Sequence, residues 1–175
     1  MFFYSDTNPL LSWAEAQIPG ADSRCKQIAV ETKRIIETTG GNFSISEITL
    51  VEFHSNLFKW ERDTGKPNFG SAEADLCLIQ IMDWIFHGHI QVIKLAPKLI
   101  EKAMAYVRLA TRNGSCPLKA WDALHLAQAN EWAHSLGVVV NIVTNDNVFE
   151  KFLKSFPEFT EYVKVYDPLK KKFYP

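Results

Sequence analysis

The sequence predicts an α/β fold, a three-layer sandwich in which helices cover both faces of a central parallel sheet. Short β-rich runs alternate along the chain with longer segments of helical spacing, a pattern typical of parallel strands joined by helical crossovers. The strongest of these runs, residues 138–144, is almost continuously β-branched, as expected for a strand buried on both faces. No linker, repeat or low-complexity stretch divides the 175 residues, so we expect a single domain over 1–175.

The strands are expected where apolar or alternating runs end in small polar residues or glycine. In chain order these runs are residues 1–5, 42–45, 90–95, 138–144 and 162–166. The last run leads into a basic tail, Lys170 to Lys172, which lies outside every predicted helix and strand.

The helices are expected between these strands, and their boundaries follow from capping residues, prolines and glycines. In chain order they begin at Pro9 and then cover 21–39, 46–62, 71–87, 97–112, 117–136 and 148–155. Asn8, Ser46 and Ser71 are the expected N-caps. The helices over 46–62 and 71–87 are joined by a short loop at 63–70 and should form an antiparallel hairpin.

Four acids are placed by these elements at one edge of the sheet. Asp6 and Asp146 each follow a strand, while Glu52 and Asp122 lie in early turns of helices that start at the same edge. Open α/β sheets bind their ligands outside the carboxyl ends of the strands. Crowded carboxylates repel one another, and Mg²⁺ or Mn²⁺ relieves this repulsion by taking oxygen ligands. The pattern therefore indicates a metal-assisted reaction on a phosphodiester.

Small polar residues flank the two acids that follow strands. Thr7, Asn8, Thr144 and Asn145 could orient the carboxylates or metal-bound waters. Each also has an ordinary structural interpretation, since Asn8 and Asn145 are common helix caps and Thr144 is a common strand residue.

The acids have structural interpretations too. Asp6 could be only a helix cap, Asp122 a favourable charge near a helix start, and Glu52 a partly buried acid paired with Lys or Arg. His125 lies three residues after Asp122, and Asp-x-x-His on a helix can ligate zinc. No other histidine has matching spacing, so a packing or peripheral position is favoured for His125.

Four sequence segments carry a resemblance to a known family. They are YSDTNPLL at 4–11, ISEITLVE at 45–52, WDALHLA at 121–127 and VTNDNVF at 143–149. In this order they resemble the PIN-domain ribonucleases, particularly the VapC-like toxin branch, and they span the chain to about residue 152.

The resemblance implies a central strand order of 3-2-1-4-5, in which the strands of Asp6 and Asp146 are neighbours. It implies an acidic catalytic quartet of Asp6, Glu52, Asp122 and Asp146 that uses Mg²⁺ or Mn²⁺, with Asp6, Asp122 and Asp146 as the expected metal ligands and Thr144 in support. It also implies an endoribonuclease that acts on RNA, a possible small antitoxin partner and a homodimer, for which the predicted hairpin helices are a plausible surface.

Composition limits the kinds of binding partner and the cellular compartment that we expect for this protein. The formal net charge of -1 excludes RNA binding by bulk charge, so any RNA site must be a local basic surface. Three scattered cysteines and the absence of a long apolar run favour neither disulfides nor a membrane span, so a cytoplasmic protein is expected.

Basic and aromatic side chains near the predicted cleft are candidates for holding RNA. The basic candidates are Lys94, Lys98, Lys102, Arg108, Arg112 and Lys119, with a second group of Lys59, Arg62 and Lys66 at the hairpin tip; the aromatic candidates are Trp13, Trp60 and Trp121.

Two other functions remain open on the sequence. One is a non-catalytic RNA-binding or scaffold module with the same fold. The other is an aspartate-based phosphotransfer domain, which is disfavoured because Asn8 stands where a second acid is generally needed. A dinucleotide-binding fold is disfavoured because no glycine-rich turn follows the first strand.

Overall fold

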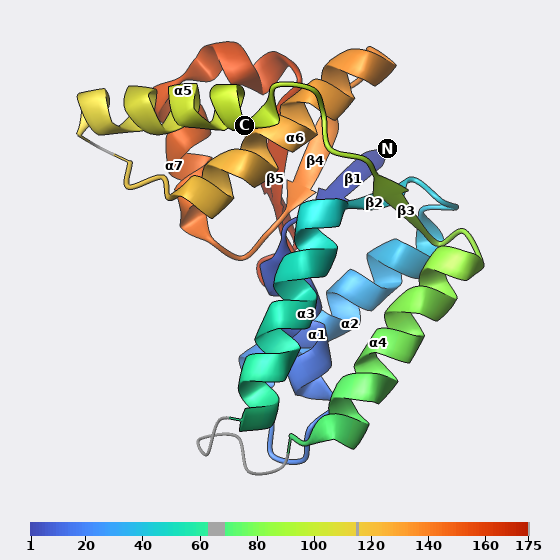
Figure 1. Cartoon of the computed structure of the whole chain (residues 1–175). Helices are drawn as coiled ribbons and strands as arrows, with labels where there is room; N and C mark the ends of the chain where they lie inside the picture. Colours follow the sequence, from blue (N-terminus) through green and yellow to red (C-terminus); the bar gives the residue numbers. More distant parts are fainter. Residues whose placement is uncertain (63–68, 115, 175) are drawn as a thin grey trace.

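The computed structural model describes residues 1–62, 69–114 and 116–174; residues 63–68 of the predicted loop at 63–70, with Lys66 among them, lie outside these ranges. Within these residues the chain forms one six-stranded sheet, which Figure 1 shows with β1 between β2 and β4. The strands are β1 (Phe2–Ser5), β2 (Phe43–Ser46), β3 (Ile90–Ile93), β4 (Val140–Val143), β5 (Val163–Asp167) and β6 (Lys172–Tyr174). Their order is β3-β2-β1-β4-β5-β6, so the predicted central order 3-2-1-4-5 is confirmed. The first five strands are parallel, and β6 runs antiparallel to β5.

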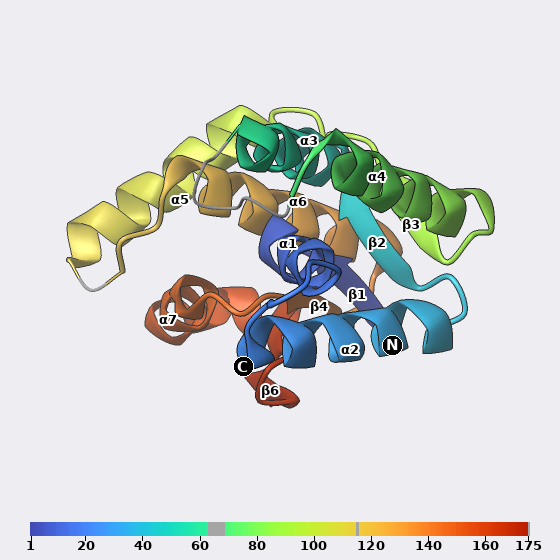
Figure 2. The ribbon, with the colours of Figure 1, turned by 90° about the horizontal axis from the view of Figure 1, so that it is seen from below.

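The helices of the described residues cover both faces of this sheet. They are α1 (Thr7–Ala16), α2 (Ser23–Thr38), α3 (Glu47–Arg62), α4 (Ser71–Phe86), α5 (Leu99–Asn113), α6 (Ala120–Leu136) and α7 (Asn147–Ser155), followed by a short 3-10 helix at Pro157–Glu161. Helices α1 to α4 pack on one face of the sheet and α5 to α7 on the other. Figure 2 shows α2 running along the lower part of the view, with α1 above it and α3 and α4 at the upper edge. None of the helices within these ranges is long and apolar enough to cross a membrane.

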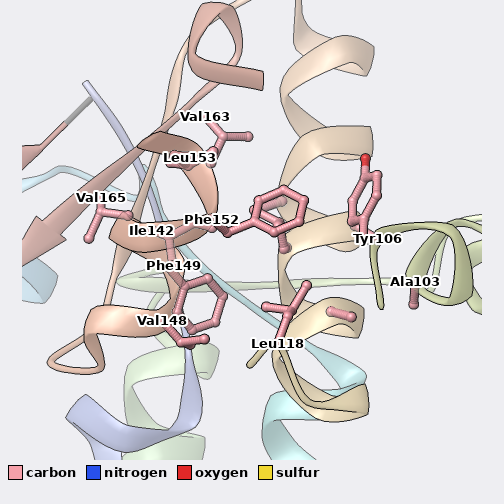
Figure 3. Close-up of a cluster of buried hydrophobic side chains, with 14 of the residues drawn as sticks. Ala103, Tyr106, Leu118, Ile142, Val148, Phe149, Phe152, Leu153, Val163 and Val165 are labelled. Carbon is pink, nitrogen blue, oxygen red and sulfur yellow. The ribbon is translucent and has the colours of Figure 1, made fainter. Parts of the chain in front are cut away.

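Alternation of side chains along the strands divides the core into two clusters. Tyr4 and Ile142 point into a cluster under α5, α6 and α7, whereas Phe3 and Val143 point into one under α1 to α4. Figure 3 shows the first cluster, in which fully buried Phe152 lies among the side chains of α7 and the neighbouring strands. Burying such a side chain stabilises a fold by about 1.5–3 kcal/mol. This cluster fixes α6 and α7 against the sheet, and these two helices begin beside Asp122 and Asp146.

Several predicted helix starts are wrong by one to three residues. Helix α1 begins at Thr7 and is capped by Asp6, so Asn8 lies inside the helix and is not its cap. Asp6 can cap because its Oδ1 accepts a hydrogen bond from the Thr7 backbone N–H at 2.7 Å. Helix α4 is capped by Gly70, and Ser71 is its first residue. Helix α5 begins at Leu99, after Lys98 adopts a left-handed φ of 59°.

Helix α6 starts at Ala120 instead of Pro117. The backbone N–H of Leu118 bonds to the Cys116 carbonyl at 2.9 Å, which closes a tight turn before the helix. The Asp122 carboxylate then accepts a hydrogen bond from the Lys119 backbone N–H at 3.2 Å. Asp122 therefore lies in the first turn of α6, not the second, and its carboxylate points back toward the helix start.

The basic tail leads into a strand that the sequence did not predict, β6, which begins at Lys172. Asp167 closes the turn between β5 and β6, because its Oδ1 accepts hydrogen bonds from the backbone N–H groups of Leu169 and Lys170 at 2.9 and 3.2 Å. Lys171 follows with a left-handed φ of 51°. The chain then pairs back along β5, with Asp167 opposite Lys172.

Candidate metal centre

Asp6 lies at the carboxyl end of β1, where α1 begins, and its carboxylate is almost fully buried. Besides the backbone N–H of Thr7, it accepts hydrogen bonds from the Asn8 side-chain amide and the Thr144 hydroxyl, both at 3.0 Å to Oδ2. Thr144 follows β4, which pairs with β1. Asp6 therefore caps α1 and also contacts the residue that follows the neighbouring strand β4. The structural interpretation of Asp6 as a helix cap is thus compatible with a position in the predicted site.

Glu52 reaches the same point from the second turn of α3. Its Oε2 accepts hydrogen bonds from the Thr7 hydroxyl and from Nε2 of His125, the latter at 3.0 Å. If Glu52 were only a structural acid, Lys or Arg would be its expected hydrogen-bond partner. The structure shows His125 and Thr7 in that place.

His125 is buried among the acids, so of the two expected positions, packing or peripheral, the structure shows the packed one, inside the cleft. Its side chain is 1% exposed, and its Nε2 also lies 3.6 Å from Asp6 Oδ1. Its Nδ1 lies 2.8 Å from the Tyr4 hydroxyl, which donates its own proton to Ser46 Oγ at 3.0 Å. Since Tyr4 has no second proton to give, Nδ1 must donate, and Nε2 donates to Glu52. The contacts therefore favour the doubly protonated, charged imidazolium.

The pKa values around His125 agree with these contacts. Burial alone would lower the pKa of His125, but Tyr4, Glu52 and Asp6 together raise it to about 10. Burial likewise opposes the charged form of Glu52, but hydrogen bonds from His125 and Thr7 lower its pKa overall. For Asp6 burial prevails over its hydrogen bonds, and its pKa is raised.

Asp122 and Asp146 face the same edge from the starts of α6 and α7. Asp146 is the N-cap of α7, because its Oδ1 accepts a hydrogen bond from the Val148 backbone N–H at 3.0 Å. The pKa of Asp122 is raised first by burial and further by the charges of Asp6 and Asp146. These two acids therefore act on Asp122 electrostatically, as expected if the carboxylates share one cleft.

The described residues contain one group whose ligand atoms all lie within 4.8 Å of one another, namely Asp6, Glu52 and His125. This group differs from the expected metal ligands Asp6, Asp122 and Asp146, of which it contains only Asp6. Both ring nitrogens of His125 already contact protein side chains, so the histidine is not free to bind a metal ion. The donor set that remains is rich in carboxylate oxygen, which suits Mg²⁺ or Mn²⁺.

Three of the four predicted supporting residues contact the acids. Thr7, Asn8 and Thr144 donate to Glu52 or Asp6, and Thr144 also accepts the backbone N–H of Asp146 at 3.1 Å. Asn145 does not join them, and its buried Oδ1 has no hydrogen-bond partner in the described part of the chain.

The sequence did not single out Tyr4 or the central place of His125. The spacing of Asp122 and His125 was a usable signal, because residues three apart lie on one helix face. The contact with Tyr4 joins residues separated by 121 positions and has no local signature.

The aromatic and basic candidates for holding RNA include residues on α3, α5 and α6. An apolar groove of about 560 Å³ lies between α3, the loop before α5, and α6, and Trp121 lines it beside Asp122. Trp121 is 51% exposed, whereas Trp13 is part of the core. Among the basic candidates, Lys59 lowers the pKa of Glu52 by its charge, and Lys102 is paired with Glu131.

No protein-family model matches this chain, and no curated protein sequence matches it significantly. Solved structures do match. One is the crystal structure of VapBC2 from Rickettsia felis bound to a DNA fragment from its promoter (TM-score 0.57, 15% identity, 95% of this chain and 100% of that chain). Another is FitAcB from Neisseria gonorrhoeae (TM-score 0.57, 17% identity, 95% and 98%). A third is DNA-bound VapBC from Salmonella typhimurium (TM-score 0.56, 17% identity, 96% and 98%). At these identities the similarity shows the shared fold.

Proposed function

We propose that this chain is a metal-dependent endoribonuclease and the toxin of a toxin–antitoxin pair. One observation carries the proposal: Asp6 and Asp146 follow two directly paired parallel strands, and Glu52 and Asp122 reach the same edge from neighbouring helices. Four acids in one cleft are unfavourable for a fold by themselves and suit a centre that holds a divalent metal. The fold shared with the VapBC2 and FitAcB structures supports the same conclusion.

The residues present fit a hard divalent cation. Asp6, Asp122 and Asp146 would hold it, because they offer carboxylate oxygens and face one another closely enough to perturb Asp122. When bound, Mg²⁺ or Mn²⁺ supplies charge stabilisation for a phosphodiester and for the water that attacks it.

The chain's own residues fix the carboxylates in place. Thr7 N–H, Asn8 and Thr144 hold both oxygens of Asp6, so this buried acid is oriented before any ligand arrives. Tyr4 and His125 act as positioning residues for Glu52, because the charged imidazolium bonds to its Oε2 and is itself held by the Tyr4 hydroxyl. Such oriented groups need little reorganisation during a reaction.

We propose single-stranded RNA as the substrate, an antitoxin as one partner and a second copy of the chain as another. The exposed Trp121 indole beside Asp122 offers a surface on which an unpaired base could stack. Exposed apolar residues on the α3–α4 hairpin, such as Phe58, Ile79 and Phe86, support association between copies.

Cys25, Cys77 and Cys116 are free, which agrees with a reducing cytoplasm.

The test is cleavage of a mixed-sequence single-stranded RNA with Mn²⁺ or Mg²⁺. The unmodified chain should cut it, and EDTA should stop cleavage. Asp6→Asn and Asp146→Asn should each lower the rate by at least about a hundredfold, a typical loss when a preorganised charge is removed from a reaction centre. Asp83→Asn, the same change on the exposed face of α4, is the matched control and should cut normally.

Two results would contradict the proposal. Cleavage that is unchanged by EDTA and by both substitutions would show that the acids and metal take no part. RNA binding without cleavage under any metal would favour the non-catalytic scaffold instead.

A further inference from the structure

The basic tail places a lysine at the rim of the acidic cleft. A small hollow at the carboxyl ends of β4 and β5 is lined by residues from the segment after β4 and from the β5–β6 hairpin. Its charged lining residues are the acids Asp146, Glu150 and Asp167 and one base, Lys170, and Thr144 and Tyr174 also line it. Thr144 bonds directly to Asp6, so the hollow adjoins the acids through one shared side chain. The turn after β5 therefore brings a positive charge to the otherwise acidic edge of the sheet.

Lys170 is held at this rim but keeps a free donor. Its Nζ lies 3.2 Å from Asp167 Oδ2 and 5.6 Å from the centre of the Tyr174 ring, and its side chain is 58% exposed. An ammonium has three N–H donors, and its hydrogen bonds to Asp167 and to the side chain of Tyr174 leave one of them for a ligand. The hydrogen bond to Asp167 also raises the pKa of Lys170, so the ammonium stays charged at neutral pH.

The hairpin that carries Lys170 is anchored to the body of the protein. Tyr166 on β5 donates to buried Glu31 of α2 at 2.6 Å, and Arg34 donates to the same carboxylate at 2.5 Å. Lys171 lies 3.8 Å from Glu31. Lys172 lies 5.3 Å from the Tyr174 ring, so a second ammonium is close to the ring that Lys170 contacts.

We propose that the β5–β6 hairpin is the arm that holds the RNA backbone on the Asp146 side of the cleft, with Lys170 as its phosphate-binding residue. This proposal rests on the proposed function, because it concerns the substrate of the same centre. An RNA phosphate that approaches four acids meets repulsion, and a fixed lysine beside Asp146 offsets it. The chain's net charge of -1 makes such a local basic contact necessary for RNA binding.

The experiment compares Lys170→Ala with Lys164→Ala, the same loss of charge on an exposed residue of β5 that does not line the hollow. Binding of a fluorescein-labelled single-stranded RNA is measured by anisotropy in EDTA at several salt concentrations, and cleavage is measured separately with Mn²⁺. Lys170→Ala should weaken binding roughly three- to tenfold and reduce the slope of log affinity against log salt by about 0.7, the value of one phosphate contact. It should also raise KM with little change in kcat. Lys170→Arg keeps the charge and should leave RNA affinity, the salt slope and KM near those of the unmodified chain. Lys164→Ala should change none of these three quantities.

The outcomes separate this proposal from the proposed function. If the unmodified chain cuts RNA but Lys170→Ala behaves like Lys164→Ala, the hairpin proposal is wrong and the proposed function stands. If binding depends on Lys170 but no metal supports cleavage, the hairpin proposal holds and the proposed function is wrong. If the unmodified chain neither binds nor cuts RNA, both are wrong.

Discussion

Replacing His125 by glutamine tests the charged contact at the centre of the site. The histidine is 1% exposed, and it contacts a 5% exposed Asp6 side chain and a 25% exposed Glu52 side chain. Glutamine retains a hydrogen-bond donor but removes the positive charge. The substitution therefore leaves two carboxylates close together without their buried cation.

The expected loss of stability follows from the burial of this group. Removing one partner of a buried ion pair typically costs about 3–5 kcal/mol. Glu52 is partly screened by solvent, so we expect a loss of about 2–4 kcal/mol for His125→Gln in the absence of metal. Urea denaturation in EDTA measures this difference directly.

The loss should depend on pH in a defined direction. The pKa of His125 rises from 6.5 to about 10 on folding, so the contact stabilises fully below pH 6.5 and is lost as the pH rises through about 10. The difference between the unmodified chain and His125→Gln should therefore be largest just below pH 6.5 and small above 10. Comparing the free energies of unfolding of the two proteins at each pH removes the effect of other groups that titrate in both of them.

His134→Gln is the matched control, since His134 is an exposed histidine on the same helix. Its ring packs on Tyr162, with the ring centroids 3.9 Å apart, so the substitution should change stability by less than about 1.5 kcal/mol. The reasoning is refuted if His125→Gln costs no more than this control, or if its cost does not shrink above pH 10.

Three further predictions concern the acids and the core. Asp122→Asn should raise stability without metal by about 0.5–1 kcal/mol, because burial and neighbouring carboxylates disfavour its charge; a loss in urea denaturation would contradict this. Glu31→Gln should cost about 1–3 kcal/mol in the same assay, because it weakens the bonds from Arg34 and Tyr166, and an unchanged midpoint would show that this cluster is not stabilising. Phe152→Ala should cost about 3–5 kcal/mol by thermal denaturation, and a cost under 1 kcal/mol would show that the core around α7 is loosely packed.

The strands, and the positions of Asp6 and Asp146 at their carboxyl ends, could be predicted because both depend on local patterns. Apolar runs that end in Asp6 and Asp146 mark the carboxyl ends of strands, and parallel strands bring these ends to one edge. The order of the strands needed the family resemblance, since periodicity alone does not say which strands pair. The structure confirms that β1 and β4 are neighbours, with Ser5 opposite Val143.

Features set by contacts between distant residues could not be predicted. The central position of His125 depends on Tyr4 and Glu52, which reach it from other elements. Strand β6 was missed because three consecutive lysines resemble a solvated tail, and only Asp167 and the pairing with β5 make this segment a strand. The late start of α6 reflects a turn before Lys119 that proline at 117 does not reveal.

The most direct test of the claim that the acids share a divalent metal is diffraction from a crystal soaked in Mn²⁺, recorded where manganese scatters anomalously. We expect an anomalous peak bounded by Asp6, Asp122 and Asp146, with His125 still bonded to Glu52. No peak at these carboxylates in crystals of protein that cuts RNA in Mn²⁺ would contradict the account.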